Sequence, residues 1–227
     1  MKKLTTSFLV ILLALNFTSC SDNEVITEQP QENLLKSFKL QRDASGRYSL
    51  DYEVADNTDA ISVKNEANKT NEIYLRNSDD IQQKARSSEF KLDNNKLKIG
   101  FVDANTDKRA NISVEDENIT FGKNNEGEFL STYSVKGNED GTYQLDFAVN
   151  KNVKTEFVFN EAINTFEIHL SNGKSENNEF SRTLEMPEDG TLKIDFVNHR
   201  GNQSRGYASK ESVDRKPAII VSDFGAE

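Results

Sequence analysis

The amino-acid sequence predicts an all-β protein that is built from two similar units. Apolar and polar residues alternate with a period of two along many short segments, as they do in strands with one buried face. Turn-forming residues separate these segments roughly every 8 to 12 residues. The same blocks of sequence then recur at a fixed offset of 95 residues. These observations predict two tandem antiparallel β-sandwiches of the immunoglobulin-like type. One larger sandwich or barrel made from two fused halves is the alternative that the repeat also permits.

The repeat consists of four blocks that keep one register. Residues 46–54 match 141–149, residues 65–67 match 160–162, residues 72–77 match 167–172, and residues 97–102 match 192–197. We interpret this pattern as an internal duplication, with β units over residues 34–122 and 127–227.

Each unit is expected to contain six or seven short strands. In the first unit the alternating segments cover residues 38–40, 48–54, 61–63, 73–75, 90–92 and 97–101. In the second unit they cover residues 133–135, 143–149, 157–159, 166–170, 184–186 and 192–196. Turns are expected between them, most clearly at Gly46 and Gly141, because glycine adopts the backbone angles of tight turns.

The chain begins with a segment typical of secretory signal peptides. Two lysines follow Met1, an apolar run covers residues 8–17 with one interruption, and small residues precede Cys20. The apolar run is too short to span a bilayer, which takes about 20 residues. Residues 1–19 are therefore expected to be removed, and the polar residues 20–33 are expected to form a flexible tether.

The residues around Cys20 resemble the lipobox of bacterial lipoproteins. The match is Phe17-Thr18-Ser19-Cys20, although the position of Phe17 is usually occupied by leucine. The acidic residues that follow resemble the surface-export signal of lipoproteins in the Bacteroidetes group. The resemblance implies that Cys20 becomes the acylated N-terminus and anchors the protein in the outer membrane, facing the cell exterior. A soluble secreted protein with a free cysteine is the alternative.

Composition excludes some classes of partner. The formal net charge is −10, which argues against nucleic acid and against electrostatic binding to anionic lipid. Cys20 is the only cysteine, so no disulfide is expected and the core must provide the stability. The sequence predicts no cofactor and no metal site.

No catalytic motif stands out. The two histidines, His169 and His199, correspond to Tyr74 and Ala104 of the first unit. We expect His169 on a solvent face and His199 in a turn, with no nucleophile motif nearby. Asp51 and Asp146 recur on one strand face, where solvation and edge protection explain them better than glycoside hydrolysis.

Two loops have features of binding sites. Residues 103–107 have the D-x-N-x-D spacing of a calcium loop, but the expected glycine and final glutamate are missing, so a polar loop is preferred. Residues 200–215 are locally basic in an acidic protein. Possible ligand contacts there are Arg200, Arg205, Tyr207 and Lys210, with charge balance on a solvated loop as the alternative.

These features predict a non-catalytic binding or adhesion lipoprotein whose ligand is a glycan or a protein, because loops on sandwich folds commonly carry recognition. An accessory structural subunit of an outer-membrane assembly is the main alternative. An enzyme, most plausibly a hydrolase that uses surface carboxylates, ranks last.

Overall fold

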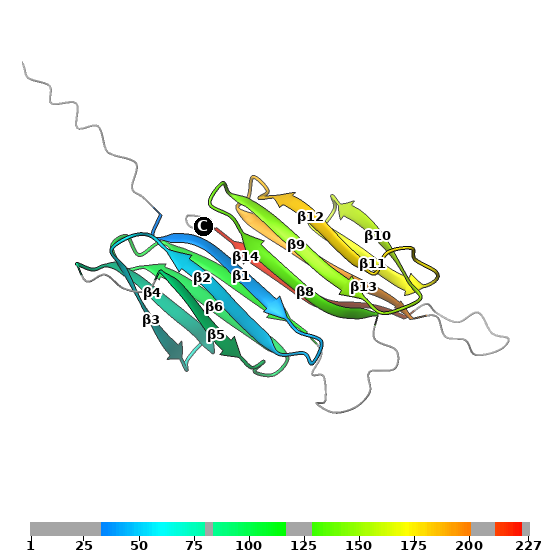
Figure 1. The fold of residues 1–227 in the computed structure, drawn as a ribbon, viewed down its shortest axis with the longest axis horizontal. Helices are drawn as coiled ribbons and strands as arrows, with labels where there is room; N and C mark the ends of the chain where they lie inside the picture. Colours follow the sequence, from blue (N-terminus) through cyan, green and yellow to red (C-terminus); the bar gives the residue numbers. More distant parts are fainter. Residues whose placement is uncertain (1–32, 80–83, 117–128, 201–211, 224–227) are drawn as a thin grey trace, which may run out of the picture. The chain divides into compact units, whose positions relative to one another are not determined.

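The computed structural model describes residues 33–79, 84–116, 129–200 and 212–223, and within these ranges it contains strands and no helices (Figure 1). The strands of the first unit are β1 Leu35–Arg42, β2 Tyr48–Val54, β3 Thr58–Asn65, β4 Thr70–Asn77, β5 Ala85–Phe90, β6 Lys96–Asp103 and β7 Arg109–Glu115. Those of the second unit are β8 Leu130–Gly137, β9 Thr142–Val149, β10 Val153–Asn160, β11 Thr165–Asn172, β12 Glu179–Glu185, β13 Thr191–Arg200 and β14 Ser212–Ser222. No helix long and apolar enough to cross a membrane occurs among the described residues.

The strands form two sheets, which confirms the predicted all-β sandwich. The six-stranded sheet has the order β12-β9-β8-β1-β2-β5, and the eight-stranded sheet has the order β10-β11-β13-β14-β7-β6-β4-β3. Each unit contributes three strands to the first sheet and four to the second. The two units therefore share both sheets, and they join where β1 pairs with β8 and where β7 pairs with β14.

This pairing decides between the two arrangements that the sequence left open. The structure has one larger sandwich made from two fused halves, not two separate immunoglobulin-like sandwiches in tandem. Local alternation could not distinguish them, because β1 and β8 bury the same residues whether they lie at a sheet edge or at a junction. The proposed gap between the units falls within residues 117–128, which lie outside the described residues.

An approximate two-fold relation connects the two halves. Leu40 of β1 pairs with Val135 of β8, and these two residues are equivalent in the repeat. In the other sheet Ser113 of β7 pairs with Ile220 of β14. These are also equivalent, because each lies opposite the corresponding lysine of the preceding strand, Lys98 in one half and Lys193 in the other. Each junction strand thus pairs with its own counterpart.

Two strand pairs depart from the expected antiparallel pattern. β4 pairs with β6 in parallel, and β11 pairs with β13 in parallel. The reason is that the intervening strand, β5 or β12, belongs to the other sheet, so the chain crosses the sandwich and returns in its original direction. This crossing places residues of β11 directly beside residues of β13.

One hydrophobic core lies between the sheets and continues through both halves. The predicted alternation is confirmed in β2, where Tyr48, Leu50, Tyr52 and Val54 are buried and the residues between them are not. Burying a side chain of this size contributes about 1.5 to 3 kcal/mol relative to exposing it. The predicted turns are confirmed at two equivalent glycines, Gly46 and Gly141, which both have a φ of 80°.

Candidate functional site

A buried glutamate with the same partners occurs in each half of the molecule. In β4, Ile73 and Leu75 face the core, so Glu72 and Tyr74 lie on the opposite, outer face of the eight-stranded sheet. Glu72 is nevertheless only 4% exposed. Its carboxylate accepts hydrogen bonds from the Tyr74 hydroxyl at 2.6 Å, from Asn65 Nδ2 at 3.3 Å and from Arg109 Nη1 at 3.1 Å.

The second half repeats this arrangement around Glu167 of β11, which is also 4% exposed. Its carboxylate accepts hydrogen bonds from Asn160 Nδ2 at 3.0 Å and from Arg215 Nη1, and it lies 2.9 Å from Nε2 of His169. Asn160, Glu167 and His169 follow Asn65, Glu72 and Tyr74 by 95 residues. Arg215 corresponds to Arg109 because each lies opposite the equivalent valine of the preceding strand, Val197 or Val102. We refer to these groups as the Glu72 cluster and the Glu167 cluster.

The Glu167 cluster contains three ionisable side chains that the Glu72 cluster lacks. His169 replaces Tyr74, Asp195 replaces Gly100, and His199 replaces Ala104. Nδ1 of His169 lies 2.7 Å from Nε2 of His199, and the two rings are inclined by only 21°. Asp195 lies 3.7 Å from Nη1 of Arg215.

The local packing is tighter at Gly100 than at Asp195. A Cβ at Gly100 would come within 3.2 Å of Oδ1 of Asn111, its neighbour on β7. Asp195 instead lies opposite Ala218 of β14, which has no polar side chain to obstruct it. The second half therefore has room for a carboxylate beside Arg215.

The charge of Glu167 fixes the hydrogen-bond directions. Burial raises the pKa of Glu167, but the hydrogen bonds from Arg215, Asn160 and His169 outweigh it and bring that pKa to about 2. An ionised carboxylate can only accept, so Nε2 of His169 carries the proton. In the tautomer that carries only this proton, Nδ1 of His169 is an acceptor, and Nε2–H of His199 donates to it. The result is a chain from His199 through His169 to Glu167.

Asp195 is the second carboxylate of the Glu167 cluster, and its pKa depends on Arg215 and Glu167. Burial raises the pKa of Asp195, the charge of Arg215 lowers it, and the nearby Glu167 raises it again. Arg215 thus interacts with two carboxylates: it donates a hydrogen bond to Glu167 and forms a longer ion pair with Asp195. Its own pKa is raised further by the hydrogen bond to Glu167.

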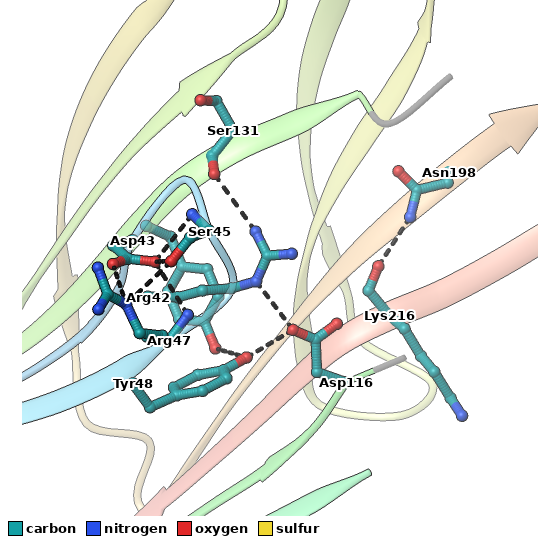
Figure 2. A network of polar contacts seen from close by, with 10 residues as sticks. Arg42, Asp43, Ser45, Arg47, Tyr48, Asp116, Ser131, Asn198 and Lys216 are labelled. Atoms are coloured by element: carbon teal, nitrogen blue, oxygen red, sulfur yellow. Dashed lines mark hydrogen bonds and ion pairs between the residues drawn. The ribbon is translucent and has the colours of Figure 1, made fainter. Parts of the chain in front are cut away.

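A second polar group, at the junction of the two halves, is enclosed by the core (Figure 2). Nε of Arg42 donates to Asp116 at 2.9 Å, and the Tyr48 hydroxyl donates to the same oxygen at 2.6 Å. The Tyr133 hydroxyl donates to that of Tyr48 at 3.2 Å. Burial, followed by the charges of Tyr133 and Asp116, raises the pKa of Tyr48 far above its usual value. Because Arg42, Tyr48, Tyr133 and Asp116 are each at most 4% exposed, this group holds the fold together and offers no surface to a ligand.

The possible ligand contacts predicted on the basic loop are not tested by the structure. Arg205, Tyr207 and Lys210 lie outside the described residues, as does Cys20. Arg200 ends β13, and its side chain also lies outside what the structure describes.

One of the two predictions about the histidines is wrong. His169 does face outward, with a quarter of its side chain exposed, but the prediction that His199 lies in a turn is wrong because it belongs to β13. Sequence reasoning treated the two histidines separately and missed their contact. The sequence signal at these positions was their common offset from Tyr74 and Ala104, but it does not reveal the parallel pairing of β11 and β13 that brings them together.

The aspartates considered for catalysis do not form a pair. Asp51 of β2 and Asp146 of β9 belong to the six-stranded sheet but are separated by β1 and β8. At about 4.8 Å per strand spacing, the two strands lie about 14 Å apart. Glycosidase carboxylates lie about 5 to 9.5 Å apart, so these two are not placed for that reaction.

The calcium-like segment forms a tight turn. Oδ1 of Asp103 accepts a hydrogen bond from the backbone N–H of Asn105 at 2.8 Å, and the backbone N–H of Asp107 donates to the Asp103 carbonyl at 2.8 Å. These bonds account for the aspartate at the start of the loop. In the described parts of the chain, no group of three or more histidine, cysteine, aspartate or glutamate side chains is arranged to hold a metal ion.

Comparison with known proteins gives no relative: no protein-family model, curated protein or solved structure matches this chain.

Proposed function

We propose that this chain is a lipoprotein that is anchored in the outer membrane, is exposed at the cell surface and acts as a non-catalytic binding module for a glycan or a protein. The lipobox-like residues before Cys20 and the acidic residues after it support the anchor and its orientation. The acyl chains would hold the protein because each buried methylene contributes about 0.8 kcal/mol.

One observation carries the binding part of the proposal: the two halves have the same buried frame but different outer surfaces. The frame of asparagine, glutamate and arginine occurs in both clusters. The first half folds around this frame without His169, Asp195 and His199, so these three side chains are not needed for the fold. Side chains that the fold does not require can serve recognition instead.

The absence of a suitably spaced carboxylate pair at Asp51 and Asp146 favours binding over glycoside hydrolysis. The surface around the Glu167 cluster lies on strands of a shared sheet, so a ligand would meet a rigid platform there. Strands position side chains more firmly than loops do.

The anchor is tested by shaving intact cells with a protease, with a Cys20→Ala variant as the control. We expect the wild-type protein to be removed while the outer membrane stays sealed, and the variant to be lost from the membrane fraction. Protection of the wild-type protein until the outer membrane is opened would contradict the surface orientation.

The binding role is tested with the triple variant H169Y/D195G/H199A, which gives the second half the residues of the first. We expect wild-type protein to retain a ligand on glycan arrays or in cross-linked cell-surface pull-downs, and the variant to lose it. A ligand that binds both proteins equally would show that the binding surface lies elsewhere on the molecule. Failure to find a ligand in either assay would count against the binding role.

A second candidate, an accessory subunit of an outer-membrane assembly, is favoured by β3. This strand forms one edge of the eight-stranded sheet, and its Ile61 and Val63 are 41% and 48% exposed. Exposed apolar side chains on an edge strand favour pairing with another chain. The assembly role predicts a stable complex after gentle solubilisation that I61T/V63T weakens, whereas recovery of the wild-type protein alone would argue against it.

A further inference from the structure

The pair formed by His169 and His199 combines features that suit a bound cation. The two ring nitrogens that face each other, Nδ1 and Nε2, are 2.7 Å apart, and the rings are nearly parallel. The other nitrogen of His169, Nε2, is held 2.9 Å from Glu167. A histidine that ligates a metal almost always donates its second ring N–H to a carboxylate in this way.

Glu167 is well suited to orient that histidine. It is buried, and its carboxylate is fixed by hydrogen bonds from Asn160 of β10 and Arg215 of β14. Its Oε2 lies 2.9 Å from Nε2 of His169, and when that nitrogen donates its proton to the carboxylate, Nδ1 of His169 carries a lone pair. That lone pair points at His199, where a metal ion would replace the shared proton.

A bound metal requires the two rings to turn. Zinc–nitrogen bonds are about 2.0 to 2.1 Å long, so two nitrogens on a tetrahedral zinc lie about 3.3 Å apart. The observed separation of 2.7 Å would therefore have to open by about 0.6 Å, and both rings would have to rotate so that the two nitrogens, which now point at each other, converge on the ion. His169 and His199 are both partly exposed, so an ion and its water ligands have access to them.

The duplication indicates that the pair is an addition to the fold. The first half has a tyrosine and an alanine at the two positions, Tyr74 and Ala104, on the same frame. Tyr74 donates to Glu72 much as His169 does to Glu167, so a histidine is not required to satisfy the carboxylate. Only the histidine provides a second nitrogen that can bind a metal.

We propose that His169 and His199 together bind a divalent transition-metal ion through Nδ1 and Nε2, with Glu167 as the carboxylate that orients His169. Imidazole nitrogens prefer zinc, copper and nickel over magnesium and calcium. Among the described side chains these two histidines supply the ligands, so the remaining coordination positions can take water or a further donor from a ligand. The sequence predicted no metal site, so this proposal departs from that expectation. The proposal does not depend on whether the protein binds a glycan or a protein.

The test is calorimetric titration of the untagged, chelator-treated full chain with Zn²⁺. All proteins carry Cys20→Ala, so that no thiol competes for the metal. We expect one equivalent of Zn²⁺ to bind and to raise the melting temperature as its concentration rises. In H169Y/H199A we expect both effects to disappear. This variant should fold, because the first half folds with the same residues.

Two further variants separate the roles of the residues. The positioning role of Glu167 predicts that E167Q binds Zn²⁺ about 10- to 100-fold more weakly than wild type. The same pair transferred to the first half, as Y74H/A104H, should add a second equivalent. In nitrogen NMR spectra, Zn²⁺ should shift His169 Nδ1 and His199 Nε2.

Either of two results would overturn the proposal: no binding of Zn²⁺ to the wild-type protein, or equal binding to H169Y/H199A. Neither result decides the outcome of the ligand assays with the triple variant, so failure of the metal site can be distinguished from failure of the binding role.

Discussion

Phe38 of β1 lies across the junction from Gly137 of β8, and a Cβ at Gly137 would stand 2.6 Å from Cε1 of the Phe38 ring. The ring also packs against Phe101 and Tyr143, with centroids 6.1 and 6.2 Å away. At the related position on the other side of the two-fold relation, Arg42 lies opposite Tyr133. The two ends of one pseudo-symmetric junction are thus filled by different chemistry, an aromatic contact over a glycine and a buried ion pair.

The variant G137A should destabilise the protein by about 1 to 3 kcal/mol, the usual cost of an extra methyl group in a packed interior. No Cβ is tolerated at 2.6 Å, so either the ring or the β1–β8 pairing must shift. Urea denaturation followed by circular dichroism measures the change. The control is a double-mutant cycle with F38L, in which G137A should cost less. An equal cost in both backgrounds would mean that Phe38 is not the cause.

The ion pair of Arg42 and Asp116 predicts a strong dependence of stability on either partner. Both side chains are buried, and the pair joins β1 to the end of β7. Removing one partner leaves a buried charge, which costs about 3 to 5 kcal/mol, so R42L and D116L should each be severely destabilised. The double variant should be more stable than the sum of the two losses predicts. Chemical denaturation of all four proteins measures this coupling, and strictly additive losses would show that the pair acts as two independent residues.

The sequence predicted the strands well because their signal is local. In β2 and β9 one face is buried and the other is not, and this alternation is visible in the residues themselves. The pairing of the strands is not local. Whether β1 ends a sheet or continues into β8 depends on a partner about 95 residues away, and Leu40 is buried in both cases.

The same limit explains what was missed at the site. His169 looked like an exposed residue and His199 like part of a turn, because each was judged by its immediate neighbours. Their contact depends on the crossing of the chain through β12, which brings β13 beside β11 in parallel. The duplication would have indicated that both positions changed, but not that they meet.

The buried glutamates predict a loss of stability in acid. The folded pKa of Glu167 is about 2, below the value of about 4.3 expected in the unfolded chain. The charged form therefore stabilises the fold above pH 4.3, and this contribution is lost as the pH falls from 4.3 through 2. Glu72, whose pKa is lowered by the hydrogen bond from Tyr74 despite its burial, should act in the same direction.

The measurement is the free energy of unfolding of wild type and E167Q between pH 6 and pH 2, with a chelator present so that no metal contributes. The advantage of the wild-type protein over E167Q should shrink as the pH falls. An advantage that stays constant over this range would show that the ionisation of Glu167 is not linked to folding.

The two-fold relation predicts how the first half would behave alone. In a fragment of residues 33–116, β1 and β7 lose the partners that they have in β8 and β14. Because each of these strands pairs with its own equivalent in the whole protein, a second copy of the fragment offers a matching partner. We therefore expect the fragment to form a two-fold dimer when it folds, since unpaired strands favour association.

A single substitution should strengthen this dimer. In the dimer Arg42 of each copy would lie opposite Phe38 of the other, where the whole protein has Tyr133. The variant F38Y supplies the missing hydroxyl, so both ends of the junction could form the network that Arg42, Tyr48, Tyr133 and Asp116 form at one end now. Sedimentation analysis should show a tighter dimer for F38Y than for the unchanged fragment, and F38L should not share the gain. If the unchanged fragment, F38Y and F38L all stay folded and monomeric, β1 and β7 do not need a partner strand. That result would contradict the expectation that two copies pair as the two halves of the whole protein do.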